Sequence, residues 1–389
     1  MNKVQKGYFP LWLIVFSSIV LLVSQNSKYY FLQNGEIYLY FISFGVFAIS
    51  GTHMIDAENK KISYVLFFLM VFFVSLFGII HQERPFVTII YEFIFSCIYL
   101  SLKYEYRFWI YNKFIKILSI LFLLGIIEYI LLYAGVDFFW GTYERENMEF
   151  YQGIFTSVPV YYSEVPARFM AFCEEPGLVG TLSFFILISL DKTKYRKEFY
   201  IFLISGILSL SMAFYLLGLL YFVLHFRKYF FSFKKLLAIA IVVVLAFTFL
   251  GDFLDYRIFG RVNSKDAIET LDNRNDDNVN KKFDNYIKTS DALLGVGHRT
   301  YYNWKKQTDS ISVGLKEQLF MYGFVGVFMI FIIFSLIYLK YNGKNKERLK
   351  VLLLYWVSFY QRSYWFFPPL VIVIFNNRNI YENRNLNIS

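Results

Sequence analysis

Long apolar blocks recur along the whole 389-residue chain, and they restrict its fold more than any other feature. Most are long enough to cross a hydrocarbon core of about 30 Å as a helix. Only 17% of the residues are charged, whereas a soluble domain carries about 25%. We therefore predict an all-α, polytopic membrane bundle that forms one integral domain over residues 1–389. The predicted spans are Phe9–Ser24, Ile37–Gly51, Ile62–Ile80, Phe86–Leu102, Phe114–Ala134, Gly177–Leu190, Tyr200–Phe226, Leu236–Gly251, Gln318–Leu339 and Val351–Phe375.

Basic residues lie mainly in short loops between these spans, which is the pattern of cytoplasmic loops in membrane proteins. If the spans alternate in direction, all of these loops lie on the same side as the N-terminus, which is then cytoplasmic. The net charge of +10 follows from these loops and gives no reason to expect a nucleic-acid partner. The basic loops are Lys60 and Lys61, Lys103 to Lys116, Lys192 to Lys197, Arg227 to Lys235, and Lys340 to Lys350.

Two apolar stretches have basic residues at both ends, so each should enter and leave the membrane on the same side. Tyr200–Phe226 is too short for two full spans of about 20 residues each. We predict two short helices there, meeting near Ser209–Ser211 and shielded by neighbouring helices. Val351–Phe375 poses the same problem, with Pro368 and Pro369 as the predicted break. The predicted number of spans is therefore ten to twelve.

Two large loops remain on the outer face of this arrangement. Residues 135–168 are acidic and aromatic, and residues 252–317 are polar and rich in charges of both signs. Loops of this size between membrane helices are uncommon unless they have a function. We therefore expect functional side chains in or beside these two loops.

The segment RFMAFCEEPG, residues 168–177, closes the first outer loop and begins the next span. Pro176 suits the first turn of a helix, which puts Glu175 at the N-cap, where the free amides favour an anion. In a functional interpretation, Arg168 holds a diphosphate, while Glu174 or Glu175 acts as a base or binds sugar hydroxyls. In a structural interpretation, the arginine anchors the chain at the interface and a carboxylate caps the helix.

The segment LLGVGHRTYY, residues 293–302, lies late in the second outer loop. Gly295 and Gly297 allow the backbone to turn tightly and to approach a ligand. His298 could shuttle a proton near neutral pH, and Arg299 follows it directly. The alternative is a glycine turn whose neighbouring side chains are simply solvated.

Further charged residues are candidates for the same site. Arg257 and Arg261 are four residues apart, so one helical turn would bring together two guanidinium groups that suit a diphosphate. Anchoring to lipid headgroups is an equally good reading of that pair. Arg362 lies within an apolar stretch, and a helix break would let it reach the outer face. Ionisable groups in spans usually face the bundle interior, so Glu92 and Glu128 are predicted to pair with basic groups there.

The order and placement of these motifs resemble those of the O-antigen polymerase family, often called Wzy, which is related in fold to the O-antigen ligases. The likeness in topology covers nearly the whole chain. In residues it is confined to an R-x(6)-EPG segment within Arg168–Gly180, the GVG element at Gly295–Gly297, and Asp309–Gly326, which ends in YGFVG.

The resemblance implies a polysaccharide polymerase of the bacterial inner membrane that makes O-antigen, capsule or exopolysaccharide at the periplasmic face. Such enzymes pass a growing glycan from undecaprenyl diphosphate to a new lipid-linked repeat, without a metal or cofactor. The implied partners are the undecaprenyl-diphosphate-linked oligosaccharide and the lipid bilayer, with a chain-length regulator as a further candidate. The implied catalytic residues are Glu175, Glu174 and His298, and the implied diphosphate- or substrate-binding residues are Arg168, Arg257, Arg261, Arg299, Arg362, Gly295 and Gly297.

Three other activities stay open. The related ligases carry a histidine–asparagine pair before the span that follows the GVG element, but Thr308–Phe320 contains no histidine. A flippase or other transporter would place its charges inside the spans, whereas most charges here lie in loops. A membrane acyltransferase would need a catalytic histidine near a span, and His81 and His225 each stand alone. These comparisons favour the polymerase.

Overall fold

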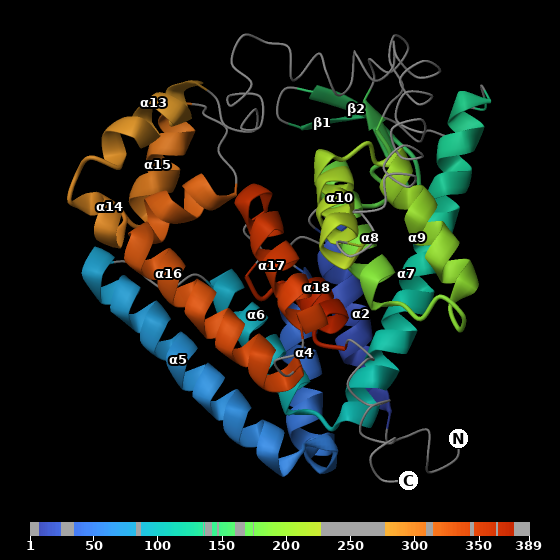
Figure 1. Ribbon diagram of the computed structural model, residues 1–389, viewed down its shortest axis with the longest axis horizontal. Coiled ribbons are helices and arrows are strands. Elements are labelled where there is room, and N and C mark those ends of the chain that lie inside the picture. The colour runs from blue at the N-terminus through green and yellow to red at the C-terminus, as the bar shows by residue number, and fades with distance from the viewer. Residues whose placement is uncertain are drawn as a thin grey trace.

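The computed structural model describes residues 8–24, 35–82, 87–134, 136, 142–145, 148–159, 168–173, 175–226, 277–308, 314–342, 346–362 and 365–376. This part of the chain is predominantly helical (Figure 1). Three of its helices, with 25, 30 and 28 residues, are long and apolar enough to cross a membrane, namely α5 (Ala57–His81), α7 (Tyr104–Tyr133) and α16 (Leu315–Asn342). Length and composition therefore support the prediction of a helical membrane protein.

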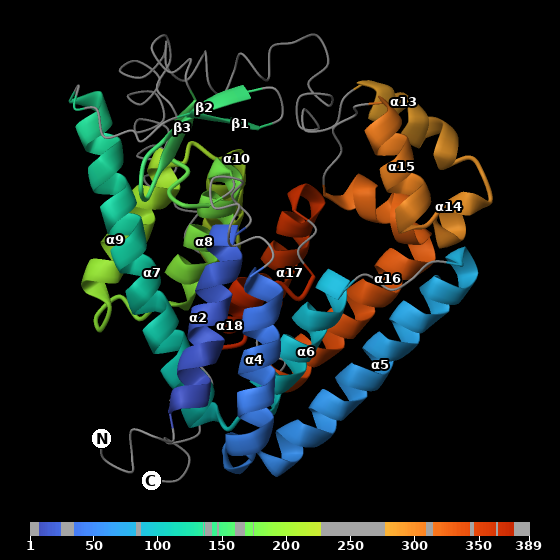
Figure 2. The same ribbon diagram turned by 180° about the vertical axis from the view of Figure 1, so that it is seen from behind.

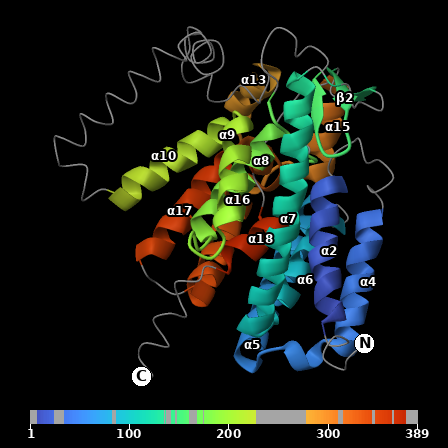
Figure 3. The ribbon, with the colours of Figure 1, turned by 90° about the vertical axis from the view of Figure 1, so that its right-hand side faces the viewer.

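The other helices are shorter, and several of them lie between α7 and the pair α5 and α16 (Figures 1 and 2). In chain order they are α2 (Phe9–Ser24), α4 (Gly35–Ser50), the 3-10 helix η2 (Thr52–Met54), α6 (Val87–Ser101), α8 (Pro176–Ser189), α9 (Arg196–Leu208), α10 (Met212–Phe226), α13 (Asp277–Tyr286), α14 (Asp291–Leu294), α15 (His298–Thr308), α17 (Lys346–Gln361) and α18 (Pro368–Ile374). Helices α2 and α4 run side by side, and α5 runs along α16 (Figures 1, 2 and 3).

Helix ends that are distant in sequence meet at one end of the bundle, which we call the basic end. The Lys103 N–H donates to the Met54 carbonyl at 2.9 Å, which joins the start of α7 to the start of α5. The Tyr341 hydroxyl donates to the Asn59 carbonyl at 3.3 Å, which brings the end of α16 to the same place. The Tyr195 hydroxyl, just before α9, donates to the Asn112 side chain in the first third of α7.

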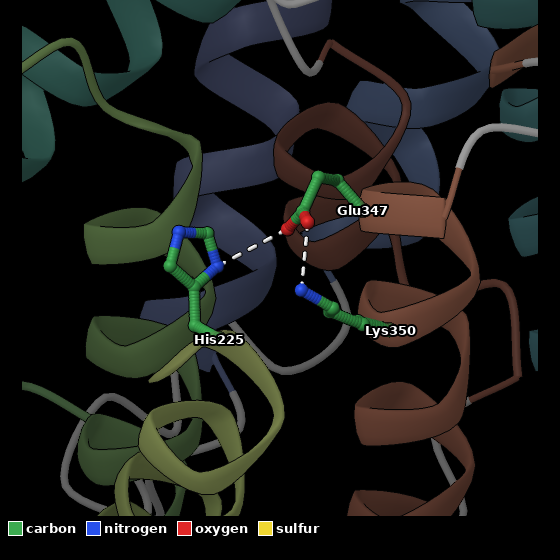
Figure 4. Close-up of polar contacts among 3 residues, drawn as sticks. All are labelled: His225, Glu347 and Lys350. Atoms are coloured by element: carbon green, nitrogen blue, oxygen red, sulfur yellow. Dashed lines mark hydrogen bonds and ion pairs between the residues drawn. The ribbon is translucent and has the colours of Figure 1, made fainter. Parts of the chain in front are cut away.

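The end of α10 reaches the basic end as well. His225 lies 3.1 Å from Glu347 in the first turn of α17, and Lys350 lies 2.6 Å from the same carboxylate (Figure 4). These side chains are exposed or half-exposed, so the ion pairs contribute little to stability. The contact between His225 and Glu347 places the start of α17 beside the end of α10. The described basic loops therefore share one end, as alternation of the spans predicts.

The predicted first outer loop contains a small antiparallel sheet, which is a departure from an all-α fold. Its strands are β1 (Thr142–Arg145), β2 (Met148–Gln152) and β3 (Ser157–Pro159), paired in the order β1-β2-β3. Thr142 lies opposite Tyr151, and Tyr151 lies opposite Val158, all of them residue types that favour strands. The three strands pair with one another through their backbones.

Glu128, near the end of α7, holds the turn between β2 and β3. Its carboxylate accepts hydrogen bonds from the backbone N–H groups of Ile154, Phe155 and Thr156 at 3.0, 2.7 and 2.8 Å. The prediction that Glu128 pairs with a basic side chain is therefore wrong for the described part of the chain. Three amides satisfy an ionised carboxylate as well as a cation does, and the arrangement fastens the sheet to α7.

Both predicted helix breaks are confirmed. The stretch Tyr200–Phe226 divides into α9 and α10, which are separated by Ser209–Ser211, with Leu210 at a φ of +47°. The last apolar stretch divides into α17, which ends one residue before Arg362, and α18, which begins at Pro368. A proline at the first helical position has no N–H to leave unsatisfied, so α18 can begin within the protein interior.

Part of the second outer loop forms α13, α14 and α15, which pack over the start of α16. The Tyr286 hydroxyl donates to the Leu319 carbonyl at 2.7 Å, and the Tyr286 and Phe320 rings are 4.8 Å apart. We call these three helices the helical cap. The predicted span Leu236–Gly251 lies outside the described residues, so the total of ten to twelve spans stays a prediction.

Candidate functional site

Three helix interruptions lie at a similar depth in the bundle. Helix α8 ends near the basic end, where the Ser189 hydroxyl lies 2.8 Å from that of Tyr111, and α9 and α17 begin there. These helices have 14, 13 and 16 residues, so they extend about 20–24 Å at about 1.5 Å per residue. Each of these helices is therefore shorter than a hydrocarbon core of about 30 Å.

Glu175 and Arg362 form an ion pair between two of these interruptions. Glu175 is the N-cap residue of α8, as predicted, but its side chain makes no capping hydrogen bond to the described amides of that helix. The carboxylate instead meets the guanidinium of Arg362, directly after α17. The Arg362 side chain is 3% exposed and that of Glu175 is 35% exposed. A buried cation thus sits behind a carboxylate that solvent or a ligand can reach.

Arg168 is held at the third interruption. Its Nε donates to the Ser209 carbonyl at 3.2 Å, and the Phe169 N–H donates to the Leu208 carbonyl at 3.0 Å. The carbonyls at the end of α9 have no helical partner of their own, so the segment before α8 supplies the donors. Arg168 is half-buried, and its backbone is fixed between α8 and the α9–α10 break.

Gly180 brings α8 close to the same break. A Cβ atom at this position would lie 2.5 Å from the Ser211 Cβ and 3.1 Å from the Ser209 hydroxyl. Any side chain here would separate α8 from the segment that binds Arg168. We define the helix-break site as Arg168, Glu175, Arg362 and Ser209–Ser211. Its chemistry combines two guanidinium groups, a carboxylate and backbone carbonyls, which suits an anion that also carries hydroxyl groups.

Comparison with models of known protein families, with curated proteins and with solved structures finds no match for this chain.

The GVG element packs against a kink in α16. Gly295 and Gly297 have φ angles of +85° and +84°, and Gly323 within α16 has a φ of +62°. A Cβ on Gly295 would lie 2.4 Å from the Met321 carbonyl oxygen, and one on Gly323 would lie 2.4 Å from the Leu293 carbonyl oxygen. The two backbones touch, and only glycine allows both this approach and these angles.

The backbone amides of this element bond to the protein itself. The N–H groups of Gly295, Val296 and Gly297 donate to carbonyls at 2.6, 2.7 and 3.2 Å, the last two of them in α16. His81, at the end of α5, donates from Nε2 to the Leu294 carbonyl at 3.0 Å. In this arrangement the glycines join the helical cap to α16 and α5, which is a structural role beside the predicted role in substrate binding.

His298 and Arg299 begin α15 in the helical cap. The His298 ring stacks on Tyr302 with 4.2 Å between centroids, and burial lowers its pKa to about 4. Its imidazole is therefore neutral and weakly basic at neutral pH, while Arg299 is exposed. Helix α15 packs against α16, whereas α8 packs against α9, α10 and α18. His298 and Arg299 therefore lie in a different set of packed helices from Glu175.

A polar cluster at the start of α16 escaped the sequence reasoning. The Tyr302 hydroxyl donates to a Glu317 carboxylate oxygen at 3.1 Å, and the Lys305 Nζ lies 4.0 Å from the same oxygen. The Glu317 side chain is 13% exposed. The signal in the sequence is a lone carboxylate in the first turn of a long apolar helix, within Thr308–Phe320.

Three predicted site residues, Glu174, Arg257 and Arg261, lie outside the described part of the chain. Within that part, no group of three His, Cys, Asp or Glu side chains is arranged to hold a metal ion. The described site residues therefore form two sets: Arg168, Glu175 and Arg362 at the helix breaks, and Gly295, Gly297, His298 and Arg299 in the helical cap.

Proposed function

We propose that this chain is a polysaccharide polymerase of the bacterial inner membrane, and that the helix-break site binds and transfers the lipid-linked glycan. The observation that carries the proposal is the ion pair between Glu175 and Arg362. It joins the EPG segment to an arginine 187 positions later in the sequence. Arg168, from the same segment, is fixed beside α8 by the Ser209 carbonyl.

The reaction requires groups of these types. The hydroxyl oxygen of the incoming repeat forms a bond to the anomeric carbon of the growing chain, and the bond from that carbon to the diphosphate oxygen breaks. The hydroxyl proton passes to the Glu175 carboxylate, and undecaprenyl diphosphate leaves with the bonding electron pair. Arg168 and Arg362 stabilise the charge that develops on the leaving group. In the absence of substrate, the ion pair satisfies Arg362, which is too deeply buried to be left without a counter-charge.

A second candidate function is transport of the lipid-linked oligosaccharide. Interrupted helices at one depth, with charged residues between them, are a common arrangement in secondary transporters. The interruptions at Glu175, Ser209–Ser211 and Arg362 follow that pattern. The position of Arg168 and Glu175 in an R-x(6)-EPG segment beside an outer loop favours the polymerase.

Deletion of the gene followed by analysis of the surface glycan separates the candidates. A strain without the polymerase should display a single repeat on its final acceptor. A strain without a ligase should accumulate long polymer on the lipid carrier, and a strain without a flippase should display neither product. Long surface polymer in the deletion strain, with no second polymerase gene, would reject the proposed function.

A further inference from the structure

Arg107 is a buried cation at the basic end, far from the helix-break site. It lies in the first turn of α7 and is only 5% exposed. Its guanidinium carbon lies 5.2 Å from the centre of the Tyr341 ring, near the end of α16. Arginine at this end of a membrane helix usually extends to the headgroups. Arg107 is instead enclosed where α7 and α16 meet.

Some N–H groups of the Arg107 guanidinium have no hydrogen-bond acceptor among the described residues. Its Nε and Nη1 atoms are buried, and they have no hydrogen-bond acceptor among the residues that the structure describes. A face of an aromatic ring offsets part of the cost of burying a guanidinium, but it does not accept these N–H groups in their own plane. Buried charges in proteins are normally paired. A negatively charged hydrogen-bond acceptor would therefore stabilise the Arg107 guanidinium.

Asn376, beside Arg107, carries a second polar group without a hydrogen-bond partner among the described residues. Its side-chain nitrogen donates to the Arg107 carbonyl at 2.9 Å and to the Tyr99 hydroxyl. Its Oδ1 atom is buried and accepts no hydrogen bond within the described ranges. We call Arg107, Asn376, Tyr99 and Tyr341 the Arg107 cluster. Its residues come from α6, α7 and α16 and from the segment that follows α18. A ligand of the Arg107 cluster must accept hydrogen bonds from the Arg107 guanidinium and donate one to the Asn376 amide oxygen.

A phosphate group meets both requirements. Its oxygens can accept from one edge of the guanidinium, where they meet the Nε or the Nη1 donor. A hydroxyl on the phosphorus, or a hydroxyl or ammonium of a lipid headgroup, can donate to Asn376. Because the cluster lies in the first turn of α7, it is at the level of lipid headgroups on the basic side.

We propose that the Arg107 cluster is a binding site for a phosphate group, carried by a membrane-lipid headgroup or by free phosphate, that stabilises the junction of α7, α16 and α18. The bound anion supplies the acceptor that Arg107 lacks. The site is separate from the helix-break site, so its occupation does not depend on the proposed polymerase activity.

The test is thermal unfolding of the full-length protein, purified in detergent, with one of two probes. The probes are inorganic phosphate and short-chain phosphatidylglycerol, each compared with sodium chloride at equal ionic strength. We expect at least one probe to raise the midpoint by several degrees, in proportion to the logarithm of its concentration above the dissociation constant. The probe that acts identifies the source of the phosphate group.

Two variants and one control complete the test. Arg107→Gln should abolish the rise, and Arg107→Lys, which keeps the charge and fits the same space, should require at least about tenfold more probe. Arg196→Gln, which changes an exposed arginine at the same end, should respond as the wild type does. The proposal is overturned if neither probe shifts the wild type more than chloride, or if Arg107→Lys responds at the same concentrations as the wild type.

Discussion

Arg362 and Glu175 are joined by an ion pair in which one partner is buried and the other is partly exposed. This asymmetry predicts unequal effects of removing each charge. Glu175→Gln deprives a buried guanidinium of its carboxylate partner and should destabilise the protein by about 1–3 kcal/mol. Arg362→Gln leaves a carboxylate that can reach water and should cost less. Thermal unfolding of the two variants checks the order, and equal losses would mean that the two side chains are equally buried.

The glycine contact between the helical cap and α16 predicts a second asymmetry. Gly323→Ala and Gly295→Ala each combine a positive φ with a clash against backbone, at 2.4 Å in both cases. Each should destabilise the protein by at least about 2 kcal/mol. Gly218→Ala in α10 is the matched control, because a Cβ there meets nothing within 4 Å. It should be neutral or stabilising by up to about 1 kcal/mol. A similar loss in all three variants would contradict the packing described here.

His298 predicts a pH dependence of stability. Its pKa falls from 6.5 to about 4 because burial disfavours the charged ring. Between these values the unfolded chain binds more protons than the folded one, so stability falls as the pH drops from 6.5 to 4. The stabilisation of the neutral ring is complete above that window. His298→Gln should lose this part of the dependence, which thermal unfolding across the window measures.

The same variant tests the predicted catalytic role of His298. A neutral, weakly basic imidazole is a poor general base at neutral pH. We therefore expect His298→Gln to keep producing polymer, in contrast to Glu175→Gln. If a stable His298→Gln protein in the membrane made no polymer, His298 would have to take part in the reaction.

The sequence predicted those features that depend on local chemistry. Basic residues at both ends of Tyr200–Phe226 required a return to the same side, and Pro368 marked the second break. Pro176 placed Glu175 at a helix start. Each signal lies within a few residues of the feature it predicts, or follows from the thickness of a bilayer. The structure confirms all three of these features.

The sequence did not predict the features that depend on contacts between segments far apart in the chain. The short strands of the predicted first outer loop pair with one another. The three amides that Glu128 binds lie 26 to 28 positions away. The contact between Gly295 and Gly323, and the bond from Tyr302 to Glu317, require α15 to fold back on α16. No local pattern specifies that fold-back. The GVG element therefore looked like a ligand turn, although its amides bond to the chain.

The central claim is that Arg168, Glu175 and Arg362 together transfer a lipid-linked glycan. The most direct measurement is complementation of the deletion strain with Arg168→Ala, Glu175→Gln or Arg362→Lys, followed by separation of the surface glycan by length. Compared with the wild type at matched protein levels in the membrane, each variant should yield a single repeat, while the wild-type gene restores the full ladder. Ladders of wild-type length from all three variants would contradict the account.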